Sequence, residues 1–198
     1  MMVAAGSKGY IGNVGVETWK WGLVPILLVA SYTDWRWQKI FNWLTFPAIL
    51  AGFAVSATAG ALSGGLGGAG RQALSSLQGF GFLALIFLVM ALLGGMKGGD
   101  LKLMAAVGAW LGWPLSVQAL LYVAICGGVF ALAWAGAHGA LGKTFLQIRN
   151  FFFAWQAGLK PSEMIVESAA PLFPYGISIG VGTLLAMLAP PLIDLGGR

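Results

Sequence analysis

Residues 100–137 read DLKLMAAVGAWLGWPLSVQALLYVAICGGVFALAWAGA and contain only two charged side chains, those of Asp100 and Lys102. The dipeptide Trp113-Pro114 is the only break in this apolar stretch. A helix that crosses a lipid bilayer needs about 20 apolar residues, so we predict two spans here, joined at that dipeptide as a tight helical hairpin. The stretch therefore favours a membrane protein built from helices.

The composition of the whole chain points to the same class. Of its 198 residues, 59% are hydrophobic and 9% are charged, whereas a soluble domain carries roughly 25% charged residues. We predict an all-α polytopic membrane protein, a single integral membrane domain over residues 1–198, because no polar block is large enough to fold alone. About six transmembrane helices are expected to form its bundle, at residues 17–34, 43–60, 77–94, 100–115, 116–137 and 172–191.

Two further segments are not predicted to span the membrane. Residues 60–70, GALSGGLGGAG, are small and flexible and predict a loop on the side opposite the chemistry. Residues 143–160 combine three basic residues with apolar ones at near-helical spacing. This pattern predicts a cytoplasmic, interfacial amphipathic helix, with a poorly ordered loop as the alternative.

The basic residues predict the orientation of the chain. Seven of the eleven Lys and Arg residues fall in segments 35–42, 95–102 and 138–171. The positive-inside rule places these segments in the cytoplasm and the N-terminus outside. The lipid bilayer is thus an expected partner, while a scattered net charge of +5 does not suggest nucleic acid.

Asp34 and Asp100 stand out among only six acidic residues. One ends the first predicted span and the other begins the fourth, so an even number of crossings puts both on the same membrane face. Each has an ordinary explanation: Asp100 could cap a helix after Gly98-Gly99, and Asp34 could be an interfacial charge beside Arg36. The helix dipole disfavours a carboxylate at a C-terminus, however, and acids within spans are functional candidates.

Such a pair can hydrolyse a peptide bond without a metal or a cofactor. Two carboxylates held close cannot both ionise cheaply, so they share a proton; one then activates a water while the other polarises a carbonyl. The chain has one cysteine, Cys126, and one histidine, His138, which excludes a disulfide framework and a cysteine zinc site. The pattern predicts a peptide hydrolase with no metal and no cofactor.

Three motifs resemble those of the type IV prepilin peptidases, over about residues 20 to 190. The first joins Asp34 to residues 40–45, IFNWLT; the second is residues 95–112, GMKGGDLKLMAAVGAWLG; the third is Pro174-Tyr175-Gly176. The resemblance implies that Asp34 and Asp100 are the catalytic pair. It implies supporting or substrate-binding roles for Asn42, Gly98, Gly99, Lys102, Pro174, Tyr175 and Gly176.

The resemblance implies a bacterial inner-membrane protease that faces the cytoplasm. Its partner would be a pilin precursor, whose short basic leader it removes. Phe41 replaces the family's usual proline, and Lys97 stands where the glycine-x-glycine-aspartate motif has its first glycine. Many members carry a cysteine-rich segment and methylate the new pilin N-terminus. With one cysteine and about eight residues between the first two spans, this chain resembles the peptidase-only form of Flp or tight-adherence pili, so no N-methylation is expected.

Three alternatives stay open at the level of the sequence. A presenilin-like protease would place its acids in mid-helix, a proton-coupled transporter would use them as a relay near the bilayer midplane, and an inactive family member would only assist pilus assembly. Two smaller expectations concern single residues: Gly176 and Gly180 form a GxxxG pattern typical of close helix packing, and Lys102 should anchor at lipid headgroups. The oligomeric state is not predicted.

Overall fold

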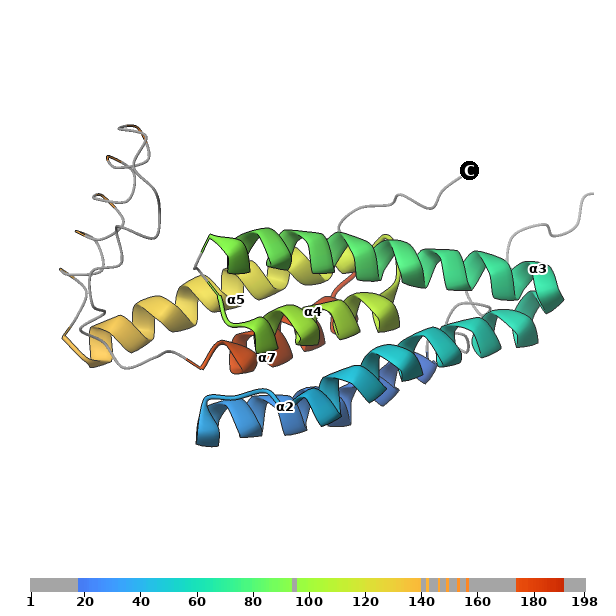
Figure 1. Ribbon diagram of the computed structural model, residues 1–198, viewed down its shortest axis with the longest axis horizontal. Helices are drawn as coiled ribbons and strands as arrows, with labels where there is room; N and C mark the ends of the chain where they lie inside the picture. The colour runs from blue at the N-terminus through green and yellow to red at the C-terminus, as the bar shows by residue number, and fades with distance from the viewer. Residues whose placement is uncertain are drawn as a thin grey trace, which may run out of the picture.

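The computed structural model describes residues 18–93, 96–139 and 174–190, together with isolated positions between 142 and 156. Every element in these ranges is helical, which confirms the predicted all-α class. Figure 1 shows η1 (Thr18–Gly22), α2 (Leu23–Trp37), α3 (Asn42–Leu92), α4 (Gly98–Leu111), α5 (Leu115–Ala137) and α7 (Tyr175–Leu188). The amphipathic helix expected over 143–160 lies outside the described residues except for those isolated positions, and the single domain over 1–198 stays a prediction.

α3 is a helical hairpin rather than one straight rod. Gly64 (φ −154°, ψ 23°) and Gly65 (φ 60°, ψ −150°) leave the helical conformation and reverse the chain; glycine adopts the positive φ without strain. Beside this turn, Gly60 and Gly68 lie backbone against backbone, with no room for a Cβ on either. The predicted loop over 60–70 is therefore wrong, because the small residues let two helices touch and only two positions break the helix.

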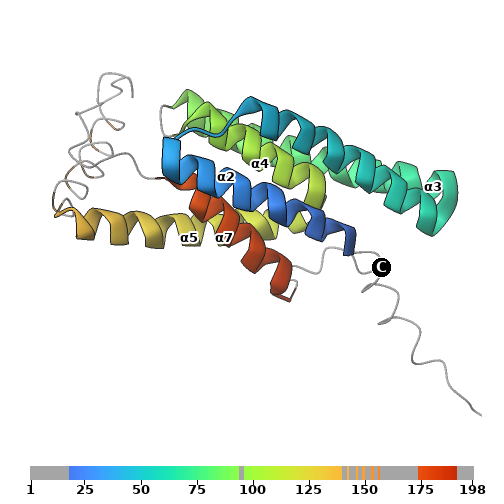
Figure 2. The same ribbon diagram turned by 90° about the horizontal axis from the view of Figure 1, so that it is seen from below.

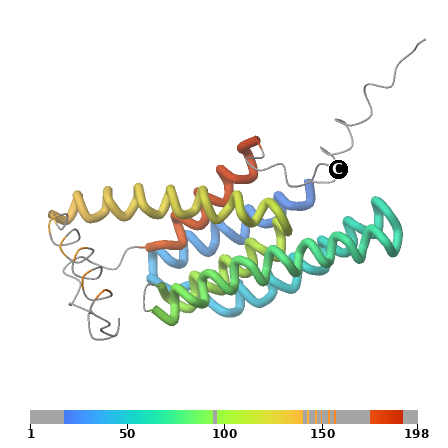
Figure 3. The backbone as a smooth tube through the Cα atoms, turned by 90° about the horizontal axis from the view of Figure 1, so that it is seen from above, coloured from blue at the N-terminus to red at the C-terminus, as the bar shows by residue number. Residues whose placement is uncertain are grey.

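The helices form a bundle in which several helix ends meet. α4 packs along the two limbs of α3, and α7 lies between α2 and α5 (Figures 1 and 2). α2 ends, and α3, α4 and α7 begin, at one end of this bundle, whereas the turn of α3 forms the opposite end (Figure 3). The expectation that residues 60–70 lie away from Asp34 and Asp100 therefore agrees with the structure.

α4 is enclosed by its neighbours, since every residue from Leu103 to Leu111 is buried. Gly108 of α4 crosses Gly79 of α3 with their backbones in contact, and a Cβ on either glycine would strike the other chain. Small residues that let helix backbones approach are typical of helix packing in membranes, where dispersion rather than water exclusion drives association. The glycines of the middle motif thus include one that sets the position of α4.

Polar side chains of α3 and α4 also join the two helices. The hydroxyl groups of Ser56 and Ser76, one from each limb of α3, both donate to the backbone carbonyl of Ala109 near the end of α4. The indole N–H of Trp110 donates to the carbonyl of Ala48 at 2.8 Å. Each bond pairs a polar group in an apolar surrounding, where an unpaired one would be costly.

Among the residues that the structure describes, two helices, α3 and α5, are long and apolar enough to cross a membrane. Only 22% of the most apolar window of α3 and 28% of that of α5 are buried in the protein, so most of these side chains face outward. α2, α4 and α7 have 15, 14 and 14 residues, fewer than the about 20 residues of a full crossing. The predicted count of six spans stays a prediction.

Candidate active site

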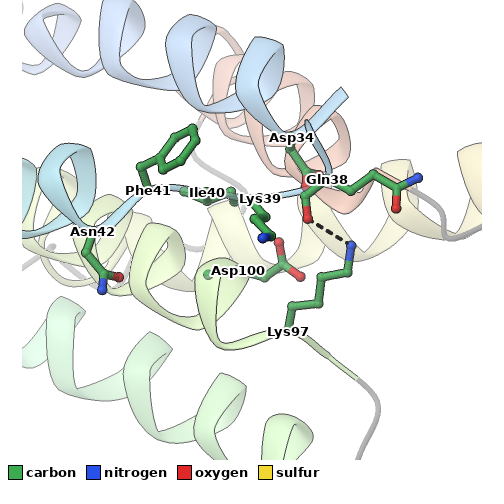
Figure 4. Close-up of a pocket in the computed structure, with 9 residues that line it drawn as sticks. Asp34, Gln38, Lys39, Ile40, Phe41, Asn42, Lys97 and Asp100 are labelled. Atoms are coloured by element: carbon green, nitrogen blue, oxygen red, sulfur yellow. Dashed lines mark hydrogen bonds between the residues drawn. The ribbon is translucent and has the colours of Figure 1, made fainter. Parts of the chain in front are cut away.

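Asp34 and Asp100 lie together at the end of the bundle where α2 ends and α4 begins. Their side chains are 2% and 4% exposed, respectively. Figure 4 shows the two carboxyl groups pointing toward a common space from opposite sides. Residues that are 66 positions apart in the sequence are thus brought to one site, as the count of spans predicts.

Asp34 lies at the C-terminal end of its own helix, which disfavours its charge, and beside the N-terminal end of another, which favours it. It lies in the last turn of α2, where the helix dipole opposes a negative charge. Its Oδ2 atom, however, accepts a hydrogen bond of 2.7 Å from the backbone N–H of Gly176. Gly176 is the second residue of α7, whose N-cap residue Pro174 makes no side-chain cap bond. Asp34 therefore satisfies an N–H group that the helix itself leaves unpaired.

The close packing of α7 on α2 depends on glycine. A Cβ on Gly176 would lie 2.9 Å from both Cβ and Oδ2 of Asp34, and a Cβ on Gly180 would lie 2.5 Å from Oγ of Ser31. The Ser31 hydroxyl in turn donates to the carbonyl of Gly176 at 3.1 Å. The GxxxG pattern is therefore a packing surface, as expected, and this surface also fixes the position of Asp34.

Asp100 is the third residue of α4 and accepts a hydrogen bond from the backbone N–H of Lys97, the N-cap residue. This is the acidic half of a capping box, in which a first-turn carboxylate reaches back to the helix start. Asp100 thus caps the start of α4 and also lies beside Asp34. The two carboxylates are also close enough to interact electrostatically.

The two carboxyl groups line a common cavity of about 260 Å³. It is smaller than the roughly 300–1,000 Å³ of most small-molecule sites, and it is open on one side rather than enclosed. The cavity is lined by Asp34, Gln38, Lys39, Ile40, Phe41, Asn42, Lys97, Gly99 and Asp100.

Five residues of this cavity were not among the predicted site residues: Gln38, Lys39, Ile40, Phe41 and Lys97. Gln38, the C-cap of α2, has φ 51° and ψ 32° and is the one non-glycine residue with positive φ in the described ranges. Its backbone carbonyl accepts a hydrogen bond of 3.3 Å from Nζ of Lys97 (Figure 4). Strained backbone of this kind often gathers at functional sites. Nothing in the local sequence indicates it, because glutamine rarely adopts this conformation.

Asn42 and Lys102, both predicted from the motifs, contact one another. Nζ of Lys102 donates to Oδ1 of Asn42 at 2.8 Å and lies 5.1 Å from the ring centre of Phe46. Lys102 therefore joins α4 to the start of α3, in addition to any contact with lipid headgroups. Asn42 itself lines the cavity.

The remaining predicted residues differ in their closeness to the acids. Gly99 lines the cavity, and a Cβ on it would lie 3.1 Å from Cβ of Ile40, whereas Gly98 has open space where a Cβ would be. Pro174 is the N-cap of α7. Tyr175 packs against Gly127 of α5, where a Cβ would lie 2.8 Å from its hydroxyl oxygen. Pro174 and Tyr175 therefore fix where α7 begins, and this start brings the N–H group of Gly176 to Asp34.

Together, the apolar helical bundle and the paired buried aspartates define a helical protein with a two-carboxylate site at one end. The type IV leader peptidase family matches residues 21–132, and the chain belongs to this family. The matched region includes both aspartates and the whole cavity, but it ends before α7.

Curated proteins are similar to this chain over part of their length. A prepilin leader peptidase/N-methyltransferase of Burkholderia pseudomallei is 34% identical over 139 residues, which cover 68% of this chain and 43% of the relative. Proteins of the same name from Klebsiella pneumoniae and Aeromonas salmonicida are 36% and 29% identical, over 50% and 56% of this chain and 42% and 37% of their own lengths. The chain thus spans less than half the length of these relatives. No solved structure gives a significant match.

Proposed function

We propose that this protein is a membrane aspartyl endopeptidase that removes the short basic leader of a type IV prepilin. The observation that carries this proposal is the pair of buried carboxylates, Asp34 and Asp100, which line one cavity. Membership in the type IV leader peptidase family supports the substrate class. The relatives are named as leader peptidases, although the region they share with this chain is only part of each.

The proposed reaction uses a water and a pair of carboxyl groups that carries one proton. The water oxygen attacks the carbonyl carbon of the scissile bond while the ionised carboxylate takes a water proton and the other carboxyl group protonates the carbonyl oxygen. The resulting gem-diol returns a proton to the second group, the C–N bond breaks, and the leaving amine takes the proton held by the first. The pair ends in its starting state, so no metal or cofactor enters the cycle.

We place the site at the cytoplasmic surface of the membrane, with about six helical segments crossing or entering the bilayer and the N-terminus outside. Seven of the eleven basic residues fall in segments 35–42, 95–102 and 138–171 of the sequence, which supports this orientation. The acids also lie at helix ends rather than halfway along, which favours a surface protease over a proton relay at the bilayer midplane. A precursor would lay its apolar helix against the bundle and present the leader junction at the cavity.

We further propose that the substrate is an Flp-like prepilin and that the protein does not methylate its product. Only residues 38–41 connect α2 to α3, and the sequence has one cysteine. This connection has no room for a cysteine-rich insertion. The name of the relatives describes two activities, a leader peptidase and an N-methyltransferase. We propose only the first of these for this chain.

The test is cleavage of a purified Flp-type prepilin by the purified full chain in detergent, with and without S-adenosylmethionine. We expect a single cut at the leader junction, and mass spectrometry should find an unmethylated pilin N-terminus in both reactions. Absence of cleavage for every prepilin tried would contradict the peptidase proposal. A product heavier by one methyl group would contradict the second proposal and leave the first standing.

A further inference from the structure

Lys97 is the residue at which this chain departs from the family's glycine-x-glycine-aspartate motif, and its side chain extends into the cavity. Figure 4 shows it reaching from the start of α4 toward Asp34 and Gln38, past Asp100. Its ammonium group donates to the Gln38 carbonyl at 3.3 Å. This bond links the N-cap of α4 to the C-cap of α2, which are the two helix ends that carry the acids.

Lys97 also contributes a positive charge beside the two buried carboxyl groups. It interacts electrostatically with both Asp34 and Asp100, which are nearly inaccessible to water. Burying a carboxylate is costly unless an opposite charge or hydrogen bonds compensate it, and two adjacent carboxylates are costlier still. The other basic residue of the cavity, Lys39, belongs to the exposed segment that follows α2.

The backbone at position 97 does not require glycine. Lys97 has φ −82° and ψ 149°, an extended conformation open to any residue. The residue is therefore free to carry a side chain without strain, and the side chain it carries reaches the opposite helix. A glycine here would start α4 equally well but could make neither the bond to Gln38 nor the charge interaction.

We propose that Lys97 is a positioning residue for the peptidase reaction: it ties the two aspartate-bearing helix ends together and stabilises a single negative charge on the acid pair. This inference rests on the proposed function for its kinetic part. Its structural part, the coupling between Lys97 and the two acids, stands independently of whether the substrate is a prepilin.

The kinetic test compares Lys97→Met, Lys97→Gly and Lys97→Arg in the prepilin assay. We expect Met and Gly to lower kcat by about 10- to 100-fold, since loss of one preorganised electrostatic group commonly costs this much or more, with KM changed less than about 2-fold. Arg keeps the charge and a donor and should stay within about 3-fold of the wild type. Arg71→Gln, on α3 beside its turn, removes a charge from the opposite end and should leave both constants unchanged. A Lys97→Gly enzyme with the wild-type kcat would overturn the proposal.

A second test does not depend on activity. Lys97→Met should lower the melting temperature in detergent by about 2–4 °C, the shift that roughly 1 kcal/mol produces in a chain of this size. In a protein that already carries Asp34→Asn and Asp100→Asn, the same change should cost less than half as much, because the charge it compensates is gone. Equal shifts in the two backgrounds would contradict the proposed coupling. A wild-type protein that cleaves no prepilin but shows unequal shifts would contradict the proposed peptidase function and support the coupling between Lys97 and the two acids.

Discussion

Oδ2 of Asp34 and the backbone N–H of Gly176 form a hydrogen bond of 2.7 Å across 142 residues of sequence. The bond places a carboxylate from the C-terminal turn of α2 at the N-terminus of α7. The dipole of α7 therefore stabilises the negative charge that the dipole of α2 disfavours. Helix α7 therefore supports the candidate site without contributing an acid to it.

The first prediction follows from the space at Gly176. Gly176→Ala puts a Cβ 2.9 Å from Cβ and Oδ2 of Asp34, so either Asp34 or α7 must move, at a cost of about 1–3 kcal/mol. We expect prepilin cleavage to fall at least about 10-fold. The matched control is Gly128→Ala on α5, where a Cβ meets nothing within 4 Å, and its activity should equal that of the wild type. Equal activities for the two variants would show that Asp34 does not need this neighbour.

The second prediction concerns the crossing of α3 and α4. In Gly108→Ala the new Cβ meets the backbone of Gly79, which cannot rotate away, so we expect the free energy of unfolding in detergent to fall by about 2 kcal/mol or more. Gly81 lies in the same limb of α3 as Gly79, but a Cβ there would have open space around it. Gly81→Ala should therefore raise the free energy of unfolding by about 0.5–1 kcal/mol through helix propensity. Changes of the same sign and size in both variants would contradict the packing described here.

The third prediction is a non-additive pair. Ser56 and Ser76 both donate to the carbonyl of Ala109, so either alanine variant leaves it one partner and should lose about 0.5–1.5 kcal/mol of stability. The double variant leaves the buried carbonyl without either hydroxyl and should cost more than the sum of the single changes. Denaturation of the four proteins in the cycle measures this excess, and simple additivity would contradict it.

The fourth prediction separates two roles of Lys102. Because its Nζ bonds Asn42 at 2.8 Å, a double-mutant cycle of Asn42→Ala and Lys102→Met should give a coupling energy of about 0.5–1.5 kcal/mol. A lysine that only anchors at lipid headgroups would lose the same energy with or without Asn42. No coupling in this cycle would therefore restore headgroup anchoring as its main role.

Part of this structure could be predicted from apolar runs and from counting spans. These gave the helical class and the shared end of Asp34 and Asp100, because hydrophobic length and chain reversal are properties of the sequence alone. The residues named by the resemblance to the leader peptidases also gather near this end. Their catalytic and supporting roles stay predictions.

What could not be predicted depends on close contacts between distant segments. Glycines at 60–70 suggest flexibility, but in the structure Gly60 and Gly68 bring two helices together. Likewise, no local pattern marks the left-handed Gln38 or shows that its carbonyl meets Lys97. Sequence reasoning could note Lys97 as a departure from the motif, but only the packing of α2 against α4 gives it a partner.

The central claim is that Asp34 and Asp100 act as one catalytic unit, and single-turnover cleavage of a prepilin by asparagine variants tests it most directly. Asp34→Asn keeps an oxygen that can accept the Gly176 N–H, and Asp100→Asn keeps one for the N–H of Lys97, so both proteins should fold. Each change alone should lower the cleavage rate at least about 10³-fold, and the double variant should be no slower than the slower single one. Asp194→Asn, the same chemical change near the C-terminus, should cleave at the wild-type rate. A folded Asp34→Asn or Asp100→Asn protein that cleaves at the wild-type rate would contradict the account.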